Sequence, residues 1–135
     1  MTYINYKMRY IKKFEALYYS DKVRKTIDDI LVELKDNGFT YFFNDIRGGL
    51  SIKIENPNIY FNLDSDLDKE IFLMLEDYMR LEWGDVDIFY EYGIIKRGSG
   101  NITKCGHTSS TKIKTITDIP DQDLLVYIKF FCSRN

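Results

Sequence analysis

Residues 20–38, SDKVRKTIDDILVELKDNG, carry the most regular pattern in this sequence of 135 residues. Apolar residues recur there at intervals of three and four, which places them on one face of an α-helix. Ser20 suits the N-cap position because its hydroxyl can accept a hydrogen bond from an unpaired amide, and Asn37-Gly38 supplies a left-handed stop. The pattern therefore predicts a helix that buries Val23, Ile27, Ile30, Leu31 and Leu34.

A second helix is predicted over residues 65–83, SDLDKEIFLMLEDYMRLEW. Ser65 is the expected N-cap, and three acids follow it in the first turn, where the helix dipole favours negative charge. The expected apolar face consists of Leu67, Ile71, Met74, Leu75 and Tyr78, widened by Phe72 and Met79.

Alternating apolar and polar residues predict strands in the rest of the chain. Residues 39–55 indicate a hairpin that turns at Gly48-Gly49. Residues 124–131 are apolar on both faces, which is typical of a central or covered strand. Residues 1–11 also alternate, although 10–18 would suit a helix as well. The predicted strand segments are 1–11, 39–55, 59–63, 86–95 and 124–131.

The order of these elements predicts one α+β domain over residues 1–135. We expect a mainly antiparallel sheet of about five to seven strands, with two principal helices packed on one face. A helix followed by a hairpin occurs at 20–63 and again at 65–114, which is compatible with an α-β-β pseudo-repeat. The length is that of a single domain, and the 44% hydrophobic and 30% charged composition is that of a soluble globular protein.

The sequence also indicates the cellular setting. It has no apolar run as long as a membrane span and no signal peptide, so a cytoplasmic protein is expected. Cys105 and Cys132 are then expected as free thiols, with a disulfide between them as the less favoured alternative. The abundance of Ile, Lys, Asn and Tyr is typical of an AT-rich genome, such as that of a low-GC bacterium or its phages.

Charge is unevenly distributed although the net charge is only −2. Residues 55–91 hold eleven acids and two bases, a net charge of −9. Such clustering indicates either a surface for an oppositely charged partner or only a solvated acidic face of the second helix. Trp83 is an aromatic anchor candidate within this segment, although a core position that closes the helix onto the sheet is favoured for it, because Trp is usually well buried. The predicted partner-binding residues are Asp66, Asp68, Glu70, Glu76, Asp77, Glu82, Trp83 and Asp85.

Residues 92–117 hold five cations and no acid. They predict either an anion-binding loop at 96–114 or only a solvated connection, since the Walker and dinucleotide-binding patterns are both missing. The candidate anion-binding residues are Lys96, Arg97, Lys104, Lys112 and Lys114.

Cys105 and His107 are the only candidates for nucleophilic chemistry. The pair has no third, orienting group beside it, and two ligands do not make a zinc site. We therefore expect no catalytic residue, metal or cofactor, and a small enzyme around this pair is the least favoured interpretation.

The favoured interpretation is a small non-enzymatic binding protein that inhibits or occludes a macromolecular partner through an acidic, aromatic-anchored surface. The expected partner is a basic or nucleic-acid-handling protein, by analogy of size and charge with toxin-immunity proteins and phage-encoded anti-defence inhibitors. The first alternative is a nucleic-acid or nucleotide binder that uses the basic segment. A homodimer is compatible with either.

Overall fold

The computed structural model describes residues 21–98, 101–106, 113–121 and 123–134, with the backbone alone for 96–98 and 101–106. The predicted strand at 1–11 and the predicted cap Ser20 lie outside these ranges. In chain order the elements are α2 (Asp21–Ile30), α3 (Val32–Asp36), β1 (Thr40–Ile46), β2 (Gly49–Glu55), α4 (Lys69–Trp83), β3 (Val86–Gly98), β4 (Asn101–Gly106), the short 3₁₀ helix η1 (Ile116–Asp118) and β5 (Leu125–Arg134).

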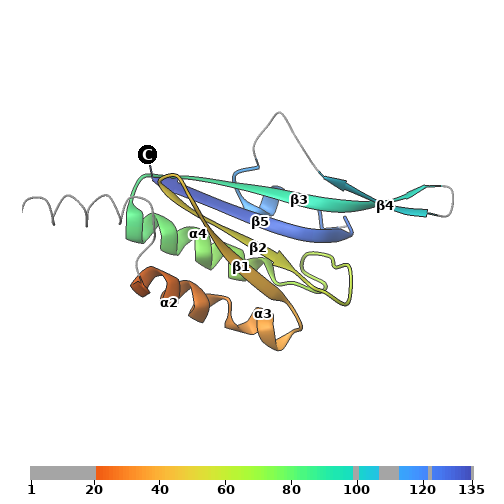
Figure 1. Cartoon of the computed structure of the whole chain (residues 1–135), viewed down its shortest axis with the longest axis horizontal. Coiled ribbons are helices and arrows are strands. Elements are labelled where there is room, and N and C mark those ends of the chain that lie inside the picture. The colour runs from red at the N-terminus through yellow and green to blue at the C-terminus, as the bar shows by residue number, and fades with distance from the viewer. Residues whose placement is uncertain (1–20, 99–100, 107–112, 122, 135) are drawn as a thin grey trace, which may run out of the picture.

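The strands form one antiparallel sheet in the order β1-β2-β5-β3-β4. The body of the sheet has four strands, because β4 pairs only with the outer end of β3, from Gly93 to Gly98. The β3–β4 hairpin therefore extends beyond the body (Figure 1). Strand β5 lies at the centre between β2 and β3, which confirms the prediction that 124–131 contains a central strand.

Three helices lie together on one side of the sheet (Figure 1). The first predicted helix is present but divided at the buried Leu31, which separates α2 from α3. Gly38 has a φ of +88° and ends α3, as the Asn37-Gly38 stop predicts. All the apolar residues predicted for this helix face are buried, except Ile30, which is half-buried.

The chain is thus an α+β protein, but the prediction of five to seven strands under two helices is wrong. Within the described residues, four strands form the sheet body and three helices cover it. Residues 59–63 make isolated bridges only, Phe61 with Leu125 and Leu63 with Leu67, because the turns at Asn56–Asn58 and at Asp64, which has a φ of +67°, leave no room for a regular ladder. The expected pseudo-repeat is limited to chain order, since β1–β2 pair along their whole length and β3–β4 do not.

The first hairpin turns one residue earlier than predicted. Ile46 pairs with Gly49, so the two turn residues are Arg47 and Gly48, and Gly48 has a φ of +77°. Gly49 is already part of β2, and a Cβ atom there would collide with the carbonyl oxygen of Cys132 on β5. The second glycine is therefore required by the close approach of two strands rather than by the turn.

The core lies between the sheet and the helices. Successive inward residues of the three inner strands are buried: Leu50, Ile52 and Ile54 of β2, Ile128, Phe130 and Cys132 of β5, and Ile88, Tyr90 and Tyr92 of β3.

Cys132 is a buried free thiol. It pairs with Ile88 of β3, whereas the backbone of Cys105 pairs with Ile94, six residues further along that strand. This separation of about 20 Å is too large for a disulfide, whose Cα atoms lie within about 7 Å. The alternative of a disulfide between the two cysteines is therefore wrong.

Candidate functional site

The most distinctive surface of the molecule is the outer face of α4. The helix buries Ile71, Phe72, Leu75, Glu76 and Met79. Four residues point the other way and form a continuous exposed line, which we call the α4 stripe: Glu70, Met74, Asp77 and Leu81. Met74 is 54% exposed and Leu81 is 85% exposed, the highest value among the large hydrophobic residues that the structure describes.

The prediction that Met74 belongs to the core is wrong, and the packing of α4 gives the reason. Phe72, Leu75 and Met79 are fully buried, and the ring of Phe72 meets that of Tyr90 edge-on at 6.0 Å. These larger contacts fix the rotation of the helix about its axis. They carry Met74 to the solvent side and bring Glu76 inward.

Glu76 is only 2% exposed, so it is not available to a partner at the surface. Its Oε2 accepts hydrogen bonds from the Tyr90 hydroxyl at 2.8 Å, the Ile116 amide at 3.1 Å and the Thr115 hydroxyl at 3.4 Å. Its Oε1 lies 3.6 Å from an Arg80 nitrogen. Burial raises the pKa of Tyr90 above its usual value, and the charge and hydrogen bond of Glu76 raise it further. The carboxylate thus ties α4 to β3 and η1.

Trp83 is half-buried and packs against the core, with the guanidinium of Arg134 4.4 Å from the centre of its ring. The core position that the sequence also allowed for this tryptophan fits that packing. The exposed apolar residues on α4 are instead Met74 and Leu81, and neither was among the predicted partner-binding residues. That these residues share one side of the helix could have been predicted from the sequence, because positions 70, 74, 77 and 81 recur at helical intervals.

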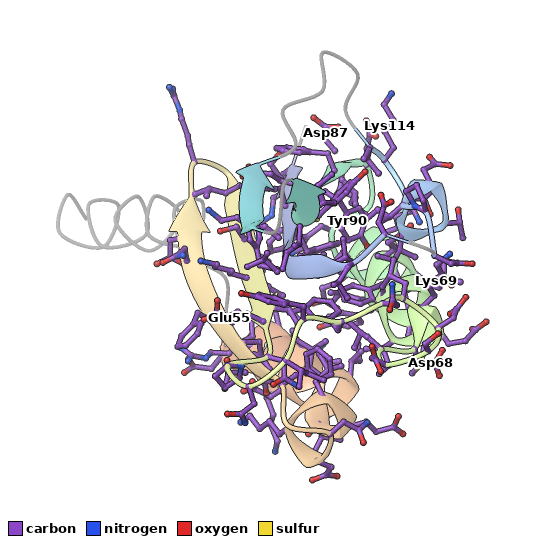
Figure 2. All side chains as sticks on the ribbon, turned by 90° about the vertical axis from the view of Figure 1, so that its right-hand side faces the viewer. Glu55, Asp68, Lys69, Asp87, Tyr90 and Lys114 are labelled. Atoms are coloured by element: carbon purple, nitrogen blue, oxygen red, sulfur yellow. The ribbon has the colours of Figure 1, made fainter. Side chains whose placement is uncertain are left out.

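Several of the predicted acids also stabilise the start of α4. The helix begins at Lys69, and its N-cap is Asp68 rather than the predicted Ser65; the Asp68 carboxylate accepts the Glu70 amide at 2.9 Å. Asp66 accepts the Asn62 amide at 2.9 Å. The ammonium of Lys69 contacts Asp121 and lies 3.9 Å from Asp64. Figure 2 shows Asp68 and Lys69 together at the surface, whereas Tyr90 lies inside the molecule.

The remaining predicted acids lie at the C-terminal end of α4. Glu82 and Asp85 are both exposed, and Glu82 lies 3.9 Å from the ammonium of Lys22 on α2. The predicted acids that are exposed on and beside this helix are therefore Asp66, Asp68, Glu70, Asp77, Glu82 and Asp85.

The described part of the predicted anion-binding loop lies mainly in the β3–β4 hairpin. Lys96 and Arg97 belong to β3 and Lys104 to β4, where the backbone pairs are Lys96 with Thr103 and Lys104 with Ile95. Lys114 follows the hairpin in the chain and is exposed at the surface of the sheet body (Figure 2). Lys112 and His107 lie outside the described residues, as does the side chain of Cys105. The structure therefore does not describe the geometry of that candidate pair.

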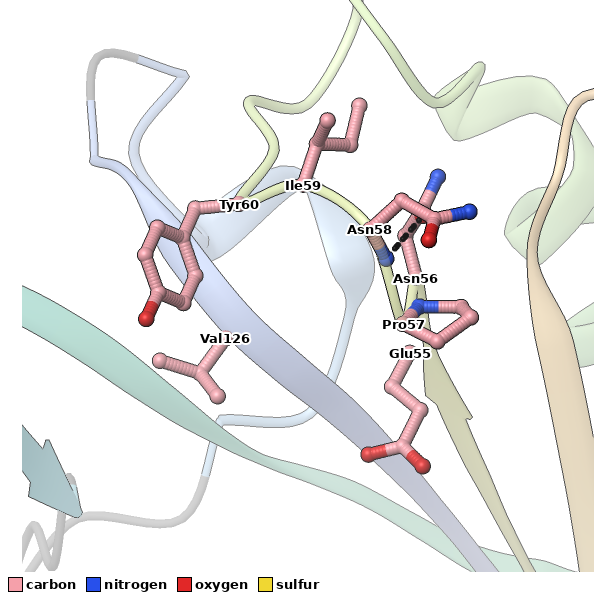
Figure 3. Close-up of a pocket in the computed structure, with 7 residues that line it drawn as sticks. All are labelled: Glu55, Asn56, Pro57, Asn58, Ile59, Tyr60 and Val126. Atoms are coloured by element: carbon pink, nitrogen blue, oxygen red, sulfur yellow. Dashed lines mark hydrogen bonds between the residues drawn. The ribbon is translucent and has the colours of Figure 1, made fainter.

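A pocket of about 330 Å³ lies beside the end of β2 (Figure 3). It is lined by Glu55, Asn56, Pro57, Asn58, Ile59, Tyr60 and Val126. The Asn58 amide donates to the Asn56 side chain at 3.0 Å, so part of the polar lining already stabilises its own turn. Among the described residues that line the pocket, Glu55 is the only carboxylate and Tyr60 the only other side chain that could transfer a proton.

Among the described residues, no three potential ligands are grouped so that they could hold a metal ion. No helix in the described part of the chain is both long enough and apolar enough to cross a membrane. Comparisons with protein-family models, with curated proteins and with solved structures found no match for this chain.

Proposed function

We propose that this chain is a cytoplasmic binding protein that occludes a basic surface of a protein partner, with the α4 stripe as its docking surface. The exposure of Leu81 among acids is the observation that carries the proposal. A single exposed leucine is ordinary. Here Met74 shares the same line, and Glu70 and Asp77 alternate with the two apolar residues. Such a surface combines apolar contact with charge selection.

The local charge supports a basic partner. Six of the predicted acids are exposed on and beside α4, and the two cations of this helix already lie beside carboxylates. Lys69 contacts Asp121, and Arg80 lies 3.6 Å from Glu76 and 3.8 Å from Asp77. The resulting negative field attracts a basic protein and repels the phosphates of a nucleic acid. A nucleic-acid-handling protein offers the basic groove that such an inhibitor would occlude, as in toxin immunity or anti-defence inhibition.

The outer face of the sheet gives little support to the nucleic-acid alternative. Phe89 and Phe131 stack on one another, with centroids 4.4 Å apart and planes within 7°, so each offers one ring face fewer to a base. Lys129 and Lys53 lie over aromatic rings of the same face. Glu91, which accepts the Tyr127 hydroxyl at 2.9 Å, adds a carboxylate that opposes phosphate binding.

Site-specific photo-crosslinking tests the proposal. A benzophenone amino acid replaces Leu81 in the full chain, and a matched variant carries it at Val32, which is 51% exposed on α3. We expect a discrete crosslinked protein from a low-GC bacterial lysate at position 81 but not at 32. The purified protein should have a basic surface, should bind the chain directly, and should bind it more weakly after Glu82→Lys. Identical crosslinks at both positions would contradict the proposal.

A further inference from the structure

The spacing of the four residues in the α4 stripe indicates which kind of structural element could dock there, which their charge alone does not. From Glu70 to Met74 is four residues, from Met74 to Asp77 three, and from Asp77 to Leu81 four. This alternation of three and four is the spacing with which one α-helix presents a seam to another helix at a shallow crossing angle. The seam spans about 16 Å along the axis at 1.5 Å per residue, or about three helical turns.

The burial pattern agrees with this reading of the helix. Residues 72, 75, 76 and 79 occupy the opposite side of a seven-residue repeat and are all buried. The flanking residues Leu73 and Tyr78 are half-buried, and Arg80 is exposed beside Asp77. The stripe is thus the centre of the one face of α4 that no described element covers.

We propose that the partner docks on α4 through an α-helix with a complementary seam, in which apolar residues face Met74 and Leu81 and Lys or Arg faces Glu70 and Asp77. This inference rests on the proposed function and names the element of the partner that is bound. An extended segment is a poorer match, because a helix surface has no unpaired backbone groups with which a strand could bond.

Charge also selects among helical occupants. A purely apolar helix would leave the carboxylates of Glu70 and Asp77 without partners in the interface, which is costly. A second copy of the stripe would bring carboxylates together in a parallel pairing and would place them against Met74 and Leu81 in an antiparallel one, so that neither arrangement supplies them with a cation. Acids in the seam therefore act against both occupants and favour a basic helix.

Designed peptides test the inference on the full chain. The first peptide is a synthetic 21-residue helix with Leu placed to face Met74 and Leu81 and Lys placed to face the two acids. A second has Glu at those Lys positions, and a third is a scrambled version of the first with the same composition. Fluorescence anisotropy measures binding at low salt and at about 0.15 M, where screening should weaken the charge contribution. Circular dichroism measures the helicity that the peptide gains on binding.

We expect the chain to bind the Lys peptide more tightly than the Glu or scrambled peptide. Asp77→Lys should reduce the preference for the Lys peptide over the Glu peptide, because one of the two acids in the seam is then a cation. Leu81→Gln should weaken binding of the Lys peptide about tenfold or more, because a buried leucine contact is lost, whereas the control Val32→Gln should not change it.

Equal binding of the Lys and scrambled peptides would overturn the inference, since the stripe would then select charge without a seam. A dimer in sedimentation equilibrium that Leu81→Gln abolishes would overturn it in favour of a second copy. A basic partner that crosslinks at position 81 through a non-helical segment would overturn the helical seam and leave the proposed function standing. Absence of both crosslinks and peptide binding would contradict both.

Discussion

The hydroxyl of Tyr90 on β3 donates a hydrogen bond to Glu76 Oε2 on α4 across 2.8 Å of the protein interior. The same oxygen accepts the Ile116 amide at 3.1 Å. One carboxylate therefore joins the sheet, the long helix and the segment that leads into β5.

Glu76→Ala should lower the free energy of unfolding by about 3 kcal/mol, because it leaves two buried donors unsatisfied. Glu76→Gln should lower the free energy of unfolding by less, since the side-chain amide oxygen can still accept a hydrogen bond. Urea denaturation measures both, with Asp77→Ala as the exposed control, which should stay within about 0.5 kcal/mol. If Glu76→Ala proves as mild as the control, the carboxylate does not tie these elements together.

Gly49→Ala should destabilise the protein at or above the upper end of the ~1–3 kcal/mol typical of overpacking, because the obstructing atom is the main-chain carbonyl of Cys132. Gly93→Ala is the matched comparison. There the nearest atom belongs to the Tyr127 ring, at 2.6 Å, and a side chain can move away. Thermal melts of the two variants should show the larger loss for Gly49→Ala; the reverse order would refute the close approach of β2 and β5.

Cys132 should make stability depend on pH in the alkaline range. Burial raises the pKa of its thiol from 9.0 to about 12, although Arg80 and Arg134 act in the opposite direction. Unfolding then releases a proton between these values, so the free energy of unfolding falls as pH rises above 9, by at most about 1.4 kcal/mol per pH unit.

Cys132→Ala should lack this contribution and should therefore show a shallower decline between pH 9 and 10, while the tyrosines contribute alike in the two proteins. Urea denaturation at several pH values compares the two proteins. If the free energy of unfolding changed with pH in the same way in both proteins, the thiol would have the same pKa in the folded and unfolded chains.

Leu81→Gln should leave stability nearly unchanged, within about 0.5 kcal/mol, because an exposed side chain at the end of a helix makes few contacts and Gln is a good helix former. Leu75→Gln, one of the buried residues of the same helix, should be strongly destabilising. Chemical denaturation of the pair distinguishes a binding residue from a core residue. A large loss for Leu81→Gln would place that side chain among the structural contacts.

The sequence predicted those features that depend on neighbours close in the chain. The periodicity of 20–38 identified the first helical region, and the two apolar faces of 124–131 identified β5 as central. The Asn37-Gly38 stop was also predicted, since a left-handed residue is a local requirement. The α+β class follows from the order of these elements.

The features that were missed depend on contacts between distant residues. Nothing in the neighbourhood of Glu76 shows that its hydrogen-bond donors come from residues 90, 115 and 116, and those donors are what allow a carboxylate to be buried. The same inward rotation exposes Met74. In the sequence Gly49 looks like the second residue of a turn, and only its contact with β5 shows why glycine is needed there. Ser65 looks like an N-cap, and only the hydrogen bond of Asp68 shows where the helix begins.

The central place of β5 has a consequence for how the chain reaches its native state. The strand comes after all the others in sequence, yet it joins β2 to β3, so most sheet contacts connect residues far apart in the chain. High contact order of this kind slows folding, because large loops must close before the pairing stabilises them. We expect the β1–β2 and β3–β4 hairpins to form as separate units that β5 then unites. In pulse-labelled hydrogen exchange, the amides linking β2 and β3 to β5 should gain protection together in the last step.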